Sequence, residues 1–138
     1  MRTQADTIQI NHVQIDKAKV NKVQAAAERL NVKRIGFLLK VKTDKIDAYK
    51  KHHENVWPEM QEALKRTGWH NYSLFMRPDG LLFGYFETPD SFQTALEGMS
   101  KEEINAKWQD FIAPYFEGMG TTHADEMMVE LEEVFHLD

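Results

Sequence analysis

Apolar residues recur at every second position over residues 33–42, where Ile35, Phe37, Leu39 and Val41 share this spacing. Successive side chains of a strand point to opposite faces, so a repeat of two is typical of a strand with one buried face. The pattern therefore predicts a first strand in this segment.

Two further apolar segments, 69–77 and 81–87, flank the turn sequence Pro-Asp-Gly at 78–80. Proline sets φ early in a turn and glycine accepts positive φ, so this arrangement predicts a β-hairpin. A last strand is predicted over residues 131–137, where apolar and polar side chains again alternate.

Alternation also divides the hairpin residues between two faces of the sheet. In its first strand, Trp69 and Phe75 are predicted on one face, opposite Tyr72, Leu74 and Met76. In its second strand the division is between Leu81, Phe83 and Tyr85 and the pair Leu82 and Phe86. Both faces are too apolar for water, so we expect helices on one face and a second copy of the chain on the other. This predicts a homodimer.

Helical spacing follows the first strand, with Thr43 and Asp44 as candidate caps. Pro58 is incompatible with a helix interior, so we expect a break near residues 55–57 and a new helix that begins at Pro58 and ends before Gly68. Four residues spaced by three and four share one face of the first of these helices: Ile46, Tyr49, His53 and Trp57.

Two more helices are predicted between the hairpin and the last strand. The first covers residues 91–99. The second is predicted to open with a capping box formed by Ser100 and Glu103, to carry Trp108, and to end near Pro114. The resulting order is β-α-β-β-α-β, which is typical of the ferredoxin-like α+β class, an antiparallel sheet with helices on one face.

Residues 1–31 differ in composition from the rest of the chain. They contain no aromatic residue and no proline and are rich in polar side chains and alanine. We expect a polar N-terminal extension with a helix over about 16–30, and one domain over residues 32–138.

Composition excludes several classes of function. The net charge is -5 at pH 7, which disfavours both nucleic acid and an anionic membrane surface as partners. The chain has no cysteine, so it has neither a disulfide nor a thiolate site. No apolar run approaches the roughly 20 residues of a membrane helix, and no secretory signal is evident, so we expect a cytoplasmic protein.

The helix face after the first strand is the strongest candidate for chemistry. Tyr49, His53 and Trp57 would bring a phenol, an imidazole and an indole to one place. The alternative is that they are core residues, which is the more common role of a lone histidine on an apolar face. The neighbouring His52 and His53 do not predict a metal site, because adjacent helical side chains point about 100 degrees apart.

Three motifs occur in one order along the chain. They are Y-x-x-x-H-x-x-x-W-P-E at 49–59, Gly-Trp-His-Asn-Tyr-Ser at 68–73 and Leu-Glu-Glu-Val-Phe-His-Leu-Asp at 131–138. Over residues 32–138 the chain thereby resembles the L-rhamnose mutarotase family. The resemblance implies a dimeric α+β barrel fold and an isomerase that interconverts the α and β anomers of a sugar without cofactor or metal.

The resemblance also implies roles for individual residues. His53 would be the catalytic proton-transferring group, and Tyr49, Tyr72 and Trp108 would contact the sugar. Trp57, on the face of His53, is a further candidate for substrate binding.

Gln109 stands where the family has the second of two adjacent tryptophans, so part of the stacking surface is replaced by an amide. We include Gln109 among the substrate-binding residues. From this change we expect a broader acceptance of sugars beyond L-rhamnose.

The chemistry of mutarotation is compatible with this residue set. Ring opening of a hemiacetal needs only proton transfer, and an imidazole with a pKa near about 6.5 serves as acid or base near neutral pH. The other histidines have weaker contexts: we expect His12, His123 and His136 to be structural or solvated, and we leave His70 undecided. Two other classes stay open, a dimeric α+β barrel monooxygenase or haem-degrading protein and a non-catalytic sugar-binding module.

Overall fold

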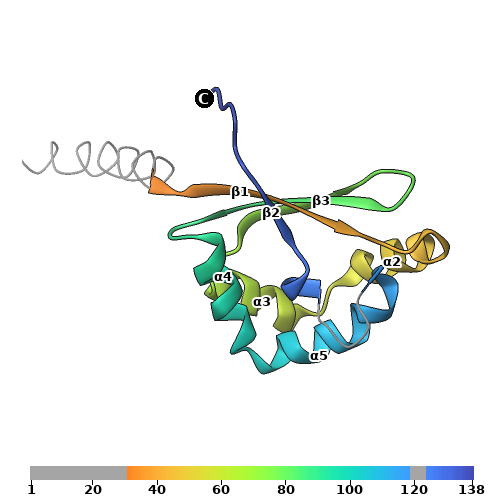
Figure 1. The fold of residues 1–138 in the computed structure, drawn as a ribbon. Helices are drawn as coiled ribbons and strands as arrows, with labels where there is room; N and C mark the ends of the chain where they lie inside the picture. Colours follow the sequence, from red (N-terminus) through yellow and green to blue (C-terminus); the bar gives the residue numbers. More distant parts are fainter. Residues whose placement is uncertain (1–30, 119–123) are drawn as a thin grey trace, which may run out of the picture. The chain divides into compact units, whose positions relative to one another are not determined.

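Four strands form one antiparallel sheet in the order β2-β3-β1-β4 (Figure 1). The structure is a computed structural model that describes residues 31–118 and 124–138; the helix predicted over 16–30 lies outside this part. The strands are β1 (Lys33–Lys40), β2 (His70–Met76), β3 (Leu81–Thr88) and β4 (Val129–Leu131). This strand order confirms the predicted ferredoxin-like α+β class.

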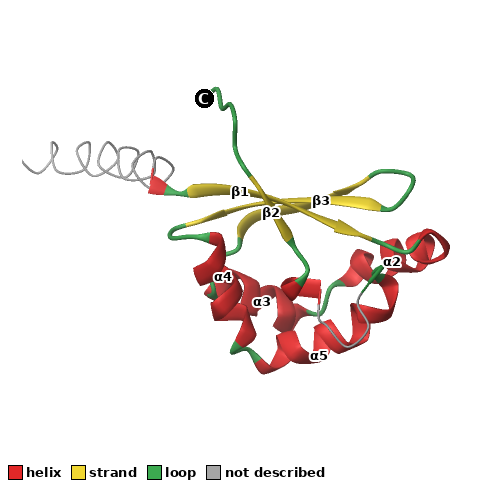
Figure 2. Cartoon of the chain, viewed as in Figure 1, coloured by secondary structure: helices red, strands yellow, loops and turns green. Residues whose placement is uncertain are grey.

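The helices all lie on one face of the sheet (Figure 2). They are α2 (Ile46–His52), α3 (Pro58–Arg66), α4 (Phe92–Ser100) and α5 (Glu103–Ile112). Short 3₁₀ turns join or extend them at η1 (Thr43–Lys45), η2 (His53–Asn55), η3 (Ala113–Tyr115) and η4 (Ala124–Glu126). None of the described helices is long and apolar enough to cross a membrane.

The core lies between this helical layer and the sheet and is centred on Phe37 of β1. Its ring stacks on Phe92 of α4 at 5.9 Å and meets Phe86 of β3 edge-on at 6.3 Å. Gly84 lies opposite Phe37 in the β1–β3 register, and a Cβ there would collide with the phenyl ring. Glycine at this position therefore gives the central ring its space.

The predicted division of faces is confirmed for β3 and wrong for Trp69, the residue before β2. Leu82 and Phe86 face the helices, whereas Phe83 lies on the open face. Trp69 was expected beside Phe75, but it is buried on the helix side. The reason is a β-bulge between His70 and Ser73, where one extra residue reverses the alternation.

Helix boundaries are confirmed where proline or a hydroxyl acts locally. The chain is extended at Val56, and Pro58 opens α3 at its first turn. The Ser91 hydroxyl accepts a hydrogen bond from the Thr94 amide at 3.0 Å and so caps α4.

The predicted capping box is wrong. Ser100 is the last residue of α4, where its hydroxyl donates to the Glu97 carbonyl at 2.7 Å. The N-cap of α5 is Glu102, which makes no side-chain cap bond. Thr43 and Asp44 likewise lie inside η1 and provide no cap bond for α2. The side chains of Thr43, Asp44 and Ser100, which were predicted as caps, therefore do not occupy the N-cap position of α2 or α5.

The predicted bounds of the last strand are wrong: it was expected over residues 131–137, and β4 covers Val129–Leu131, so only Leu131 is shared. β4 pairs with β1 only from Val129 to Leu131, and Figure 1 shows the C-terminal segment leaving the sheet beyond it. Within that segment, Val134 is 87% exposed and Phe135 is 79% exposed. Alternation is thus present after Leu131, but it does not mark strand pairing there.

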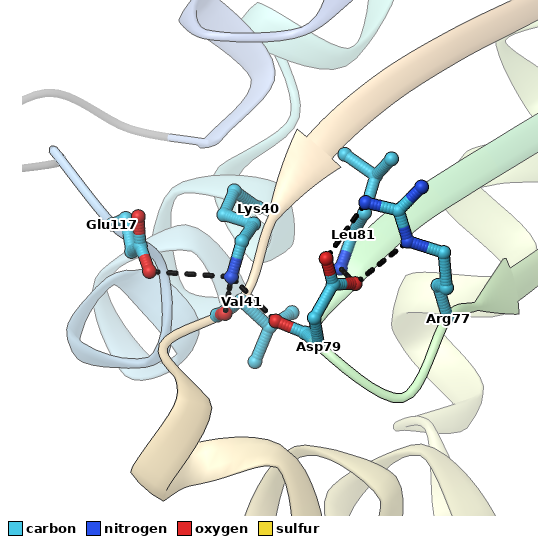
Figure 3. A network of polar contacts seen from close by, with 6 residues as sticks. All are labelled: Lys40, Val41, Arg77, Asp79, Leu81 and Glu117. Carbon is cyan, nitrogen blue, oxygen red and sulfur yellow. Dashed lines mark hydrogen bonds and ion pairs between the residues drawn. The ribbon is translucent and has the colours of Figure 1, made fainter.

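A polar network fastens the hairpin turn to the end of β1 (Figure 3). The ammonium of Lys40 donates to the main-chain carbonyl of Asp79 and pairs with the carboxylate of Glu117 at 3.3 Å. Arg77 donates two hydrogen bonds to the Asp79 carboxylate, at 2.9 and 2.7 Å, and this guanidinium holds the pKa of Asp79 well below its usual range. Gly80 has φ +93, as the turn sequence predicted. The network holds the turn end of the hairpin, which is the end opposite to the bulge between His70 and Ser73.

Candidate active site

His53 lies where α2 gives way to the 3₁₀ turn η2. Its Nδ1 is 2.9 Å from the main-chain carbonyl oxygen of Tyr49, and its ring stacks on the Tyr49 ring at 4.1 Å. A carbonyl oxygen can only accept, so Nδ1 must carry the hydrogen. In the neutral form of His53, Nε2 therefore carries the lone pair and is the basic atom.

The surroundings favour that neutral form. Burial lowers the pKa of His53, the bond to the Tyr49 carbonyl raises it, and the charge of His52 lowers it further. The net direction is downward, so the imidazole is predominantly neutral at pH 7. His52 itself is held by a 2.9 Å hydrogen bond between its Nε2 and the Tyr115 hydroxyl, which ties the end of α2 to η3.

Aromatic rings from two helices surround His53. Trp108 of α5 meets the imidazole edge-on at 5.5 Å, and Trp57 meets Trp108 in the same manner at 5.0 Å. Phe111 packs against both indoles, at 5.5 and 5.8 Å. These contacts leave His53 and Trp108 with few alternative rotamers.

A cavity of about 720 Å³ opens beside His53. Of the predicted site residues, His53, Tyr72 and Trp108 line it. The remaining wall is partly apolar, from Val56, Leu64, Trp69 and Leu74, and partly polar, from Glu54, Gln61, Lys65, His70 and Asn71. Aromatic walls with a few convergent polar groups are typical of small-molecule sites.

Three predicted residues, Tyr49, Trp57 and Gln109, do not line this cavity. Tyr49 is buried beneath His53 and meets Phe116 edge-on at 5.5 Å. Trp57 supports Trp108. Gln109 is 5% exposed and donates from Nε2 to the Asn105 side-chain oxygen at 3.2 Å. Within the part of the chain that the structure describes, its Oε1 is buried without a hydrogen-bond partner.

Sequence reasoning missed the polar wall from α3. Gln61 and Lys65 are spaced by four and share a helix face with Leu64, so both side chains reach the cavity. Helical spacing counted from Pro58 would have grouped these residues, but polar side chains at such positions are usually solvated. His70, which the sequence left undecided, also lines the cavity.

Burial raises the pKa of both site tyrosines. For Tyr72 burial is the cause, and for Tyr49 burial is the larger cause and the nearby Tyr72 a smaller one. Both phenols therefore stay protonated and act as neutral hydrogen-bond groups. Among the described residues, no cluster of three or more histidine, aspartate or glutamate side chains is arranged to hold a metal ion.

Fold and cavity together define a small α+β domain with a partly polar cavity of about 720 Å³ between strand β2 and the helical layer. The profile of the L-rhamnose mutarotase family matches residues 34–137. The chain belongs to that family, as the three motifs predicted.

Individual relatives agree with the match. An L-rhamnose mutarotase of Oceanobacillus iheyensis is 41% identical over 110 residues, which are 78% of this chain and all of the relative. An L-rhamnose mutarotase of Bacillus subtilis is 36% identical over 110 residues, which are again 78% of this chain and all of the relative. The crystal structure of an L-rhamnose mutarotase from Formosa agariphila superposes with a TM-score of 0.65 at 29% identity and covers 77% of this chain and 99% of its own.

Proposed function

We propose that the protein interconverts the α and β anomers of L-rhamnose, or of a similar aldopyranose, by acid-base ring opening in the cavity beside His53. Membership of the L-rhamnose mutarotase family supports the reaction class and favours it over the monooxygenase and binding-module alternatives. The observation that carries the catalytic assignment is the hydrogen bond from Nδ1 of His53 to the Tyr49 carbonyl, because it leaves Nε2 as a base next to the cavity.

In this reaction Nε2 of His53 takes the proton of the anomeric hydroxyl while the bond between the anomeric carbon and the ring oxygen breaks. The ring oxygen gains a proton from a second acid, and the open-chain aldehyde rotates about its first carbon–carbon bond. Ring closure on the other face of the carbonyl returns the proton from His53 to the anomeric oxygen and the other proton to the second acid. Positioned proton transfer of this kind contributes roughly 10²- to 10⁴-fold.

The remaining residues bind and orient the sugar in this proposal. The indole of Trp108 offers a flat apolar surface to the C–H face of a pyranose, and the protonated phenol of Tyr72 holds a hydroxyl. Trp57 and Tyr49 hold Trp108 and His53 in place through ring contacts.

Gln109 adjusts specificity. Its amide offers less stacking area than an indole, and because Gln109 is buried and does not line the cavity, it acts on the sugar only through the neighbouring Trp108. A smaller stacking surface discriminates less strictly between sugars, so the proposal includes acceptance of aldoses beyond L-rhamnose.

The test is anomer-exchange NMR with L-rhamnose for the wild type and for His53→Ala. The variant should fold normally and lose roughly 10² or more of the exchange rate. An unchanged rate in the variant would refute the role of His53. Sugar binding by the wild type without faster exchange would support the binding module, and a Soret absorbance band in the purified protein would support the haem-degrading alternative.

We also propose that the protein is a cytoplasmic homodimer whose copies meet through the open face of the sheet. Phe75 is 60% exposed on that face, and Val134 and Phe135 of the C-terminal segment are mostly exposed in one chain. A second copy would cover both sets. Light scattering at micromolar concentration tests this, and the mass of a monomer would contradict it.

A further inference from the structure

Strand β2 contains an irregular backbone next to the cavity. His70 pairs with Glu87 and Ser73 pairs with Tyr85, so Asn71 and Tyr72 together lie opposite one residue of β3. Asn71 has φ +48, and it is the only non-glycine residue with positive φ in the described ranges 31–118 and 124–138. Such a conformation persists only where the surroundings impose it, and bulges beside active sites commonly re-aim a side chain.

The surroundings impose this conformation through a carboxylate on β3. The Asn71 amide donates to Oε2 of Glu87 at 3.1 Å, and the Tyr85 hydroxyl donates to the same oxygen at 2.8 Å. Burial and the bond to Glu87 raise the pKa of Tyr85 to about 12, so its hydroxyl remains a donor. The conformation of the bulge is therefore stabilised by hydrogen bonds to Glu87 of β3.

The bulge changes which side chains reach the cavity. It brings Trp69 and Tyr72 to the helix side together, where their ring centroids are 5.3 Å apart. His70, between them at the edge strand, is exposed to solvent and also lines the cavity that His53 lines. Two histidine residues, His53 of η2 and His70 of β2, thus line one cavity.

Ring opening needs two proton-transfer groups at once. The anomeric hydroxyl loses a proton while the ring oxygen gains one, and a single neutral imidazole supplies only the base. Of the other groups in the wall, the buried phenol of Tyr72 is held protonated and so donates a hydrogen bond without giving up its proton. Imidazole is the side chain that both gives and regains a proton near neutral pH.

We propose that His70 is the second proton-transfer group of this site and that the bulge at Asn71 positions it in the cavity. This inference rests on the proposed mutarotase function. As the bond between the anomeric carbon and the ring oxygen breaks, the electron pair of the anomeric O–H bond becomes the second bond of the aldehyde carbonyl. His53 receives the hydroxyl proton, and the imidazolium of His70 gives a proton to the ring oxygen. Ring closure reverses both transfers, so each turnover restores the protein.

The test compares His70→Gln with His53→Ala and with the matched control His136→Gln, which changes an exposed histidine that does not line this cavity. Exchange rates come from NMR, and sugar affinity comes from quenching of tryptophan fluorescence by L-rhamnose. We expect His70→Gln to lose roughly 10²-fold in rate with an affinity within about threefold of wild type, and His136→Gln to match the wild type.

Each outcome decides between the two proposals. If His53→Ala is inactive while His70→Gln keeps the wild-type rate, the inference about His70 is wrong and the mutarotase assignment stands. If both variants keep the wild-type rate, the catalytic assignment of His53 fails as well. A loss of affinity equal to the loss of rate in His70→Gln would show a binding role and overturn the proton-transfer role.

The bulge is tested separately at Asn71. Glycine accepts positive φ and valine does not, so Asn71→Gly should keep more of the exchange rate than Asn71→Val. Equal losses in the two variants would show that the backbone conformation does not position His70.

Discussion

The two faces of the sheet carry similar aromatic side chains in different surroundings. On the helix face, Phe37 and Phe86 are fully buried, whereas on the open face Phe75 and Phe83 are 60% and 37% exposed. The cavity lies on the helix side, and the residues left for an interface lie on the other. Apolar content alone therefore does not locate the core; the position of the helices decides which aromatic residues stabilise one chain and which remain for a second copy.

The largest effect on stability is expected from a substitution on the buried face of the sheet. Phe37→Ala should lower the free energy of unfolding by about 3–5 kcal/mol, because it leaves a cavity at the centre of the core. Denaturant unfolding monitored by circular dichroism measures it. The matched control Phe75→Ala removes the same ring from the open face and should cost less than about 1.5 kcal/mol under conditions where the chain is monomeric. Equal costs would contradict the distinction between the faces.

The second prediction concerns the open face. Phe83→Asp would place a charge in the proposed interface, where an unpaired buried charge costs about 3 kcal/mol or more. Light scattering should then give the mass of a monomer with the fold intact. Gln93→Asp, on the exposed surface of α4, should leave the mass of the wild type unchanged. A dimeric Phe83→Asp variant would place the interface elsewhere.

The third prediction follows from the buried histidine of the helix face. Because burial lowers the pKa of His53, the unfolded chain binds a proton at a higher pH than the folded chain does. Stability should fall as the pH drops through the ordinary imidazole value of about 6.5, and the loss is complete below the lowered pKa of the folded state. Thermal unfolding between pH 8 and pH 5 measures it. His53→Gln should show a smaller decrease over this range, and an identical decrease would rule out His53 as its source.

A smaller effect is expected at Gln109. Gln109→Trp should shift the ratio of exchange rates toward L-rhamnose and away from L-mannose, which differ by the hydroxyl at carbon six, by about 10-fold or less. Anomer-exchange NMR with both sugars measures the ratio. An unchanged ratio would show that Gln109 does not influence the sugar site, in keeping with its bond to Asn105.

The smallest effect is expected from deleting residues 1–31. The family match begins at residue 34, and Lys33–Asp138 form one compact unit. The shortened chain should keep the exchange rate and the melting temperature of the full chain within error. Loss of both fold and activity would show that the N-terminal segment belongs to the domain.

The order of elements could be predicted because it depends on local patterns. The alternation in β1, the Pro-Asp-Gly turn and Pro58 each act within a few residues, and each is found in the structure as expected. Trp69 was misplaced because one extra residue in β2 reverses its side, and that bulge depends on a hydrogen bond from Asn71 to Glu87 across the hairpin. Local alternation carries no information about such a contact.

The lining of the cavity was predicted in part. The motifs led to His53, Tyr72 and Trp108, which do line one cavity. Gln61 and Lys65 could not be distinguished from solvated helix residues, because the sheet edge that turns their surface into a cavity wall is formed by a later part of the chain. The last strand was misplaced for a related reason, since alternation continues after Leu131 although the pairing with β1 covers only Val129–Leu131.

The partner of His53 has an implication for how this enzyme can change over time. The atom that selects the tautomer of the imidazole is the main-chain oxygen of residue 49, which every amino acid possesses. Replacement of the Tyr49 phenol would alter the stacking on His53 and the shape of the pocket, yet the hydrogen bond would persist as long as α2 remains helical. Substitutions of the side chains around His53 can therefore change the sugar preference while Nε2 remains the basic nitrogen of His53.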